Sequence, residues 1–154
     1  MNNEVVILIA EDDEGHAGLI RKNLQRAGIV NPLVHFKDGH EVLDFLFRKP
    51  GAIGREPGKA YVLLLDIRMP KLDGVEVLAA IKQDEELRKL PVIMITTTSD
   101  PREVEKCHAL GCNNYITKPV DYEAFVQAIR QLGLFLSVVQ VPVIDGDEKH
   151  DAGG

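Results

Sequence analysis

The sequence predicts an α/β fold with a five-stranded parallel, doubly wound sheet and five helices. Short apolar runs alternate with segments of helical periodicity along the whole chain, a pattern typical of a parallel sheet that helices cover on both faces. Five such units in 154 residues are too few for an eight-stranded barrel, so an open sheet is expected. In open sheets of this kind, ligands bind beyond the carboxyl ends of the strands.

The first two strands are expected at residues 5–10 and 33–36. Gly28 stands where a helix C-cap is expected after the first helix. Asp38 is a suitable N-cap for the second helix, which we expect to end at Pro50 and Gly51. These helices carry apolar residues at helical spacing: Ala17, Ile20, Leu24 and Ala27 in the first, and Val42, Leu43 and Leu46 in the second.

The other strands are expected at residues 61–66, 92–96 and 114–117. Residues 50–59 contain three Gly and two Pro, which predict a surface loop before the third strand. The last three helices follow from apolar residues at helical spacing: Val75, Leu78 and Ile81; Val104 and Cys107; and Tyr122, Phe125, Ile129, Leu132 and Leu136.

Composition excludes several classes of protein. The net charge of −6 and the absence of a basic run give no support for nucleic-acid binding. No signal-peptide pattern opens the chain and no apolar run is long enough for a membrane span, so we expect a cytoplasmic protein with no membrane partner. Cys107 and Cys112 fit neither a disulfide framework nor a zinc site, and we expect both to be reduced.

One domain is predicted over residues 1–144, followed by a mobile tail over residues 145–154 that lacks the apolar surface needed to offset the cost of ordering the chain. The apolar segment from about residue 134 to residue 143 exceeds what the last helix needs. It either packs on the domain or serves association, and we favour a homodimer contact.

Polar residues stand at the carboxyl ends of four predicted strands. Residues 11–13 (Glu-Asp-Asp) follow the first strand, Asp66 ends the third, Thr96 ends the fourth and Lys118 follows the fifth. Clustered carboxylates repel one another unless a cation is present, and oxygen ligands favour Mg²⁺. Asp13, Asp66 and a backbone carbonyl would match the few protein ligands that Mg²⁺ takes.

This set of residues suits phosphoryl transfer. An aspartate carboxylate is ionised at neutral pH and can attack phosphorus without a general base, a role that suits Asp66. The transferring group then needs a cation, a positive side chain and hydrogen-bond donors. Mg²⁺, Lys118 and Thr96 would supply them.

Four motifs resemble the receiver domains of two-component signalling. They are Ile9-Ala10-Glu11-Asp12-Asp13, Leu65-Asp66-Ile67-Arg68-Met69-Pro70 with Asp73-Gly74, Val92-Ile93-Met94-Ile95-Thr96-Thr97, and Tyr115-Ile116-Thr117-Lys118-Pro119. The resemblance covers residues 5 to about 136 and implies a flavodoxin-like sheet of order 2-1-3-4-5.

The resemblance also implies roles for individual residues. Asp66 becomes the phosphoacceptor for a histidine kinase, and the Mg²⁺ ligands become the acidic pair Asp12 and Asp13, Asp66 and the Arg68 carbonyl. Thr96 and Lys118 would contact the phosphoryl group, and Tyr115 would move with Thr96 as a switch. The expected output is a change in the surface of helix four, strand five and helix five, which would act on another protein.

A narrower resemblance is to the small regulators that partner bacterial phytochrome kinases. It is carried by the glycine-rich loop at residues 50–59, by the segments at residues 96–99 and 112–121, and by the apolar extension at residues 135–142. It implies a phytochrome-type sensor kinase as partner and light as the stimulus.

Simpler interpretations apply to single residues. The acids at residues 11–13 also suit a helix cap, and residues 97–99 are better explained as a cap before the fourth helix than as site residues. Asp66 alone would be an ordinary exposed acid, Lys118 a turn residue and Tyr115 a half-buried strand aromatic.

Two other functions stay open besides the receiver, which we expect to be a switch rather than a turnover enzyme. A phosphohydrolase with an aspartyl-phosphate intermediate is disfavoured, because such enzymes tend to place a second acid two residues after the nucleophile, where this chain has Arg68. An unphosphorylated binding scaffold is disfavoured by the intact set of Asp66, Thr96 and Lys118.

Overall fold

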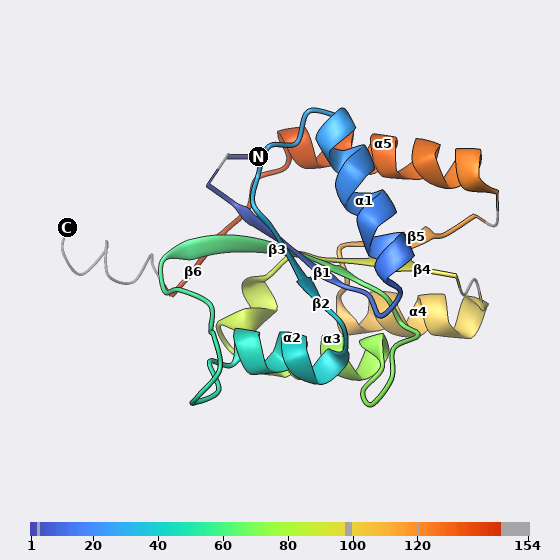
Figure 1. Cartoon of the computed structure of the whole chain (residues 1–154). Coiled ribbons are helices and arrows are strands. Elements are labelled where there is room, and N and C mark those ends of the chain that lie inside the picture. Colours follow the sequence, from blue (N-terminus) through green and yellow to red (C-terminus); the bar gives the residue numbers. More distant parts are fainter. Residues whose placement is uncertain (3, 98–99, 120, 146–154) are drawn as a thin grey trace.

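The computed structural model describes residues 1–2, 4–97, 100–119 and 121–145, in which a parallel sheet has the strand order β2-β1-β3-β4-β5 (Figure 1). The predicted sheet and its order are confirmed. The strands are β1 (Val6–Ala10), β2 (Leu33–Phe36), β3 (Lys59–Leu65), β4 (Val92–Thr96), β5 (Asn114–Thr117) and β6 (Val143–Ile144). The helices are α1 (Glu14–Arg26), α2 (Gly39–Leu46), α3 (Gly74–Gln83), α4 (Pro101–Leu110) and α5 (Tyr122–Val138), with a short 3₁₀ helix at Leu87–Lys89.

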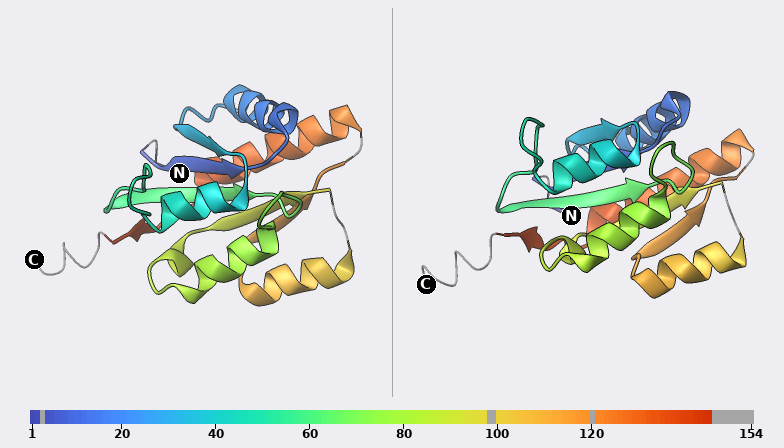
Figure 2. Two further views of the ribbon diagram at one scale, coloured as in Figure 1. Left: turned by 60° about the horizontal axis from the view of Figure 1, so that its bottom comes forward. Right: turned by 90° about the horizontal axis from the view of Figure 1, so that it is seen from below.

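Helices cover both faces of the sheet. Helices α1 and α5 lie on one face, and α2, α3 and α4 lie on the other (Figures 1 and 2). Side chains of β1 alternate between the two cores, because Leu8 packs toward α2 and α3 whereas Ile7 and Ile9 pack toward α1 and α5. Burial on both faces explains the continuous apolar runs in the sequence. None of the described helices combines the length and the apolar character of a membrane span.

An aspartate caps the start of each of the five α-helices. The side chain of Asp38 accepts a hydrogen bond from the Glu41 amide, so the cap predicted for α2 is confirmed. The cap of α4 is Asp100, followed by Pro101 in the first helical turn, and not residues 97–99, of which 98 and 99 lie outside the described residues. A carboxylate before a proline at the first helical position is a strong helix start, which explains the difference.

The structure contains a short strand, β6, that the sequence does not predict. It runs antiparallel to the start of β3, where Ile144 pairs with Lys59 and Val143 pairs with Ala60. The side chain of Ile144 is fully buried in the core between the sheet and helices α2, α3 and α4. The end of the apolar extension therefore packs on the domain.

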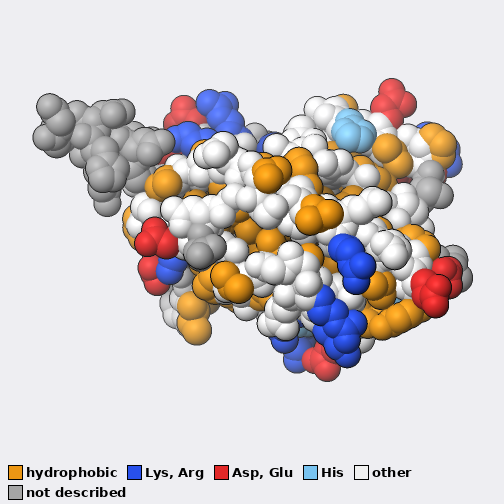
Figure 3. Space-filling model, turned by 90° about the horizontal axis from the view of Figure 1, so that it is seen from above, with side chains coloured by type: hydrophobic (Ala, Val, Ile, Leu, Met, Phe, Trp, Pro, Cys, Tyr) orange, Lys and Arg blue, Asp and Glu red, His pale blue; other side chains and the backbone are white. Residues whose placement is uncertain are grey.

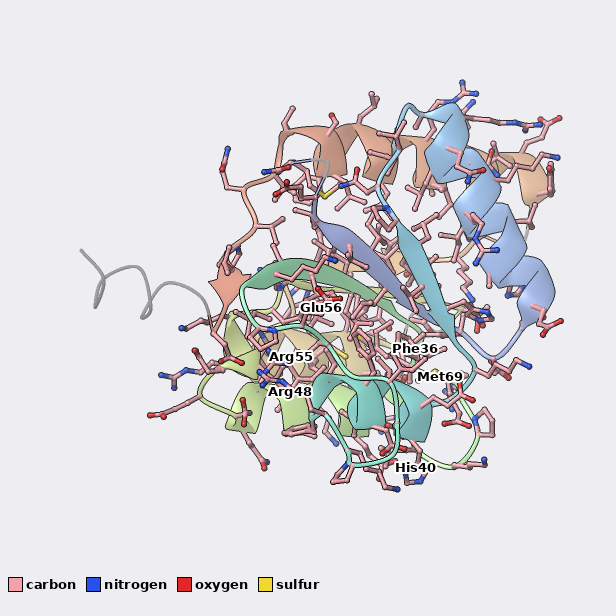
Figure 4. All side chains as sticks on the ribbon, turned by 60° about the vertical axis from the view of Figure 1, so that its left-hand side comes forward. Phe36, His40, Arg48, Arg55, Glu56 and Met69 are labelled. Carbon is pink, nitrogen blue, oxygen red and sulfur yellow. The ribbon has the colours of Figure 1, made fainter. Side chains whose placement is uncertain are left out.

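Asp145 belongs to this folded segment and not to the tail that the sequence predicts from residue 145. Its carboxylate accepts a hydrogen bond of 2.8 Å from Nη1 of the buried Arg55 and also pairs with Arg48. Arg55 is held in turn by a hydrogen bond of 2.7 Å from its Nε to the Leu46 carbonyl at the end of α2. Figure 4 shows Arg48 and Arg55 together on the side of the domain where β6 lies. Residues 146–154 lie outside the described residues.

Candidate functional site

Backbone hydrogen bonds bring the predicted site residues to one edge of the sheet. The Asp66 amide donates to the Ala10 carbonyl at 3.0 Å, which aligns the ends of β3 and β1. The Lys118 amide donates to the Thr96 carbonyl at 2.6 Å, which aligns the ends of β5 and β4. The carboxyl ends of these four strands therefore meet where the sequence predicts a site.

Lys118 lies at the centre of this edge. Its side chain is only 3% exposed, and its Nζ lies 3.2 Å from Oδ2 of Asp66. The same amine pairs with Oε1 of Glu11 and lies 3.2 Å from Nδ1 of His16. A buried ammonium is stable only when it is paired, and here carboxylates from two strand ends surround it.

Three carboxylates at this edge form a group that could hold a metal ion. Glu11, Asp12 and Asp66 each offer one oxygen, and these oxygens lie within 4.8 Å of one another. Burial is the main cause that raises the pKa of Glu11 to about 7, the hydrogen bond from Lys118 opposes this rise, and the charge of Asp66 adds to it. When all three acids are ionised, Lys118 balances one charge and leaves two negative charges, which a divalent cation would neutralise.

Asp13, which the sequence predicts as a metal ligand together with Asp12, is not part of this group of three carboxylates. Its Oδ1 accepts a hydrogen bond of 3.0 Å from the His16 amide as the N-cap of α1, and its side chain is 54% exposed. That hydrogen bond is the main reason why the pKa of Asp13 lies below its ordinary value. Strand β1 ends at Ala10, and Asp13 is already the N-cap of α1. Glu11 therefore lies beside Asp12 and Asp66, and Asp13 does not. The alternative interpretation of a helix cap is confirmed for Asp13.

The backbone of Arg68 lies against the central carboxylate. Its amide donates to Oδ1 of Asp66 at 3.3 Å. Its side chain is 65% exposed and reaches Glu103 on α4, with Nη2 3.5 Å from Oε1. The guanidinium is therefore directed away from the acids, and the Arg68 carbonyl as a metal ligand stays a prediction.

Thr96 and Tyr115 are in the positions expected from their strands. Thr96 is fully buried at the end of β4, and Tyr115 is half-buried on β5 with its ring centroid 6.4 Å from that of His108. Burial is the main cause that raises the pKa of the Tyr115 hydroxyl to about 12. Their roles toward a phosphoryl group stay predictions.

Two residues of the site were absent from the predicted set. Glu11 is the first residue beyond β1, a position that the apolar run indicates, but the adjacent Asp12 and Asp13 were assigned in its place. His16 lies in the first turn of α1, and its contact with Lys118 joins residues 102 positions apart, which no local pattern predicts. Beside His16 is a cavity of about 340 Å³, lined by His16, Leu19, Thr97, Lys118, Pro119, Tyr122 and Phe125.

Comparison with known proteins agrees with this geometry. The sequence profile of the response regulator receiver domain matches residues 7–130. The response regulator Rcp1 of Synechocystis is 32% identical over 142 residues, which cover 92% of this chain and 95% of Rcp1.

Among solved structures, a response regulator receiver domain from Rhodospirillum rubrum has a TM-score of 0.85 and 48% identity, with 92% of this chain and 99% of that chain covered. The Mn²⁺-bound form of Rcp1 has a TM-score of 0.82 and 30% identity, with 90% and 99% covered. The phosphorylated cyanobacterial phytochrome response regulator RcpA has a TM-score of 0.80 and 29% identity, with 89% and 97% covered.

Proposed function

The chain belongs to the response regulator receiver domain family, and from that membership we propose that Asp66 accepts a phosphoryl group from a histidine kinase. The observation that carries the proposal is the contact of 3.2 Å between Asp66 Oδ2 and the buried Lys118 Nζ, beside the carboxylates of Glu11 and Asp12. A positive side chain and a cation-binding group next to a carboxylate are what phosphoryl transfer requires.

In the proposed reaction, an oxygen of Asp66 forms a bond to phosphorus while the bond from phosphorus to the kinase imidazole breaks. The imidazole leaves with the electron pair of that bond. Lys118, 3.2 Å from Asp66, would stabilise the oxygens of the transferring group, and the Arg68 amide, which donates to Oδ1, would orient the carboxylate. Thr96 would contact the phosphoryl group, as the family resemblance implies.

Glu11, Asp12 and Asp66, with the Arg68 carbonyl, would hold Mg²⁺. This donor set fits a hard cation, because the carboxylates of Glu11, Asp12 and Asp66 offer negatively charged oxygen ligands. A bound divalent cation would neutralise the charge of the incoming phosphoryl group. The similar protein Rcp1 has been solved with Mn²⁺, which supports the proposal for this chain.

The proposed partner upstream is a sensor kinase of the phytochrome type, because RcpA is a phytochrome response regulator and resembles this chain over nearly its whole length. The proposed output is the surface of α4, β5 and α5, where Tyr115 would move with Thr96 on phosphorylation. That surface would act on a downstream protein.

We also propose a homodimer contact through the end of α5. Leu134, Phe135 and Val138 are 60%, 41% and 74% exposed. Figure 3 shows apolar side chains exposed on the face of the molecule that carries α1 and α5. Grouped apolar side chains that face solvent are typical of an association surface.

The test of the phosphoacceptor is transfer of labelled phosphate from a cognate kinase in the presence of Mg²⁺. Asp66→Asn should abolish labelling, because an amide oxygen is a poor nucleophile and cannot form the acyl phosphate. The matched control is Asp44→Asn on α2, which should be labelled like the unaltered protein. Undiminished labelling of Asp66→Asn would overturn the proposal.

A further inference from the structure

Lys118 has a third polar partner that belongs to none of the four sequence motifs. A lysine ammonium has three N–H donors and no acceptor. Three acceptors surround Nζ of Lys118: Oε1 of Glu11, Oδ2 of Asp66 at 3.2 Å and Nδ1 of His16 at 3.2 Å. Each N–H of the buried amine therefore has one partner, and His16 is the uncharged one.

The contact with Lys118 assigns a tautomer to the His16 ring. Because an ammonium can only donate, we assign the lone pair of the neutral ring to Nδ1 and its proton to Nε2. A neutral acceptor directs one N–H of Lys118 without adding a negative charge to the three carboxylates already present. This matters for a site that must receive an anionic phosphoryl group.

The ring itself is fixed from two sides. The His16 amide donates to Asp13 at 3.0 Å, which ties the residue to the cap of α1. The centroid of its ring lies 6.0 Å from that of Phe125, a buried residue of α5, at an interplanar angle of 54°. His16 thus connects the amine of Lys118 to two helices that pack on one another across that face of the sheet.

From this geometry we propose that His16 is a positioning residue that holds Lys118 in the orientation needed for phosphoryl transfer to Asp66. The inference rests on the proposed function and adds a residue that acts through Lys118. Without the Nδ1 acceptor, one N–H of a buried ammonium loses its partner and the amine turns toward Glu11 or toward the adjacent cavity. The oxygens of the transferring group then meet a less well-oriented donor.

The experiment uses a small donor, phosphoramidate with Mg²⁺, so that kinase docking does not enter the measured rate. The readout is the initial rate of phosphorylation followed by phosphate-affinity gel electrophoresis. His16→Leu should lower the rate about three- to tenfold, the range that one hydrogen bond is worth. His16→Asn should retain most of the rate, because its Oδ1 can accept near the position of Nδ1.

Two variants control for indirect effects. His16→Gln carries the same amide group as His16→Asn, but one methylene farther from the backbone, so its oxygen does not reach the position of Nδ1. The Gln variant should therefore be as slow as His16→Leu, although the Asn and Gln side chains are similar in polarity and size. His40→Leu makes the same substitution at an exposed position of α2 and should leave the rate unchanged. Equal rates for the Asn and Gln variants would overturn the proposal, even where the Leu variant folds poorly.

A double variant separates positioning from structural support. In a Lys118→Ala background, His16→Leu should cause no further loss, because the residue that His16 positions is absent. An equal fractional loss in both backgrounds would show that His16 only supports the fold and would overturn the inference. Failure of the proposed function is distinct from either result, because Asp66→Asn would then be phosphorylated as fast as the unaltered protein.

Discussion

At the scale of single residues, the three acids after β1 divide between two tasks. Asp12 lies with Glu11 and Asp66 in the carboxylate group, whereas Asp13 caps α1. Because each acid has a different set of partners, substitutions at adjacent positions should have different effects. The division can be tested directly with a metal titration.

Asp12→Asn should weaken Mg²⁺ binding by about tenfold or more, because it removes a charged ligand from the group. Asp13→Asn should leave Mg²⁺ binding nearly unchanged, since its side chain contacts the helix amide and Asn is an equally good cap. Isothermal titration of both variants with Mg²⁺ measures the difference. A loss for Asp13→Asn as large as that for Asp12→Asn would favour the acidic pair predicted from the sequence.

How far the sequence predicts the site depends on the kind of contact. Asp66, Thr96 and Lys118 lie at the strand ends where the sequence predicts them, because long apolar runs locate the ends of those strands. Among residues 11–13, the structure groups Glu11 and Asp12 with Asp66, whereas the sequence favours Asp12 and Asp13. The difference depends on the residue at which a strand ends and a helix begins, where the boundaries of a pattern are least certain. The contact of His16 with Lys118 depends on the packing of distant elements and leaves no periodic trace in the sequence.

At the scale of elements, two glycines in helices should respond in opposite ways to alanine. A Cβ on Gly39, at the start of α2, would lie 2.4 Å from the Leu72 carbonyl oxygen, so Gly39→Ala should cost about 1–3 kcal/mol of unfolding free energy. A Cβ on Gly18 in α1 has no neighbour within 4 Å, so Gly18→Ala should stabilise by about 0.5–1 kcal/mol. Urea unfolding of both variants checks the signs, and a stable Gly39→Ala variant would show that α2 can move away from Leu72.

The strand β6 should contribute more to stability than its length suggests. Ile144→Ala removes a fully buried side chain and should cost about 2–4 kcal/mol in urea unfolding. Ile53→Ala is the matched control, because Ile53 is 87% exposed and should change the free energy by less than about 0.5 kcal/mol. A cost for Ile144→Ala as small as that of the control would mean that the segment does not stay packed.

The contrast between β6 and the other strands has a physical cause. Strands β1 to β5 have four to seven residues, enough for continuous apolar runs to reveal them, and four of the five follow the predicted bounds closely. A strand of two residues has no period, and the adjacent Pro142 suggests a break. Its pairing with β3 becomes visible only when the chain is folded.

At the scale of the whole molecule, Asp145 closes the C-terminal segment onto the loop before β3. Burial alone would raise the pKa of Asp145, but the hydrogen bond and charge of Arg55, with the charge of Arg48, outweigh it and hold the pKa below its ordinary value. A lowered folded pKa means that the pair contributes stability above the unfolded value of about 3.9 and loses it as the pH falls through the folded pKa.

Asp145→Asn should therefore destabilise the protein at pH 6, where Arg55 loses its charged partner. The difference in unfolding free energy between the two proteins should shrink as the pH falls below about 4, because the protonated acid then resembles the amide. Urea unfolding of both proteins between pH 6 and pH 3 gives this difference directly. A difference that stays constant over the whole range would contradict the linkage.

The exposed end of α5 is the surface that we propose as the homodimer contact. Leu134 and Val138 are four residues apart on one helix face, so a double substitution to Glu places two like charges where each copy would meet the other. We expect the unaltered protein to sediment as a dimer at micromolar concentration and the double variant as a monomer. Ile53→Glu, at an exposed apolar position before β3, should leave the dimer intact. If all three proteins sediment alike, α5 is not the contact, and the exposed side chains of this helix are then available to the downstream protein.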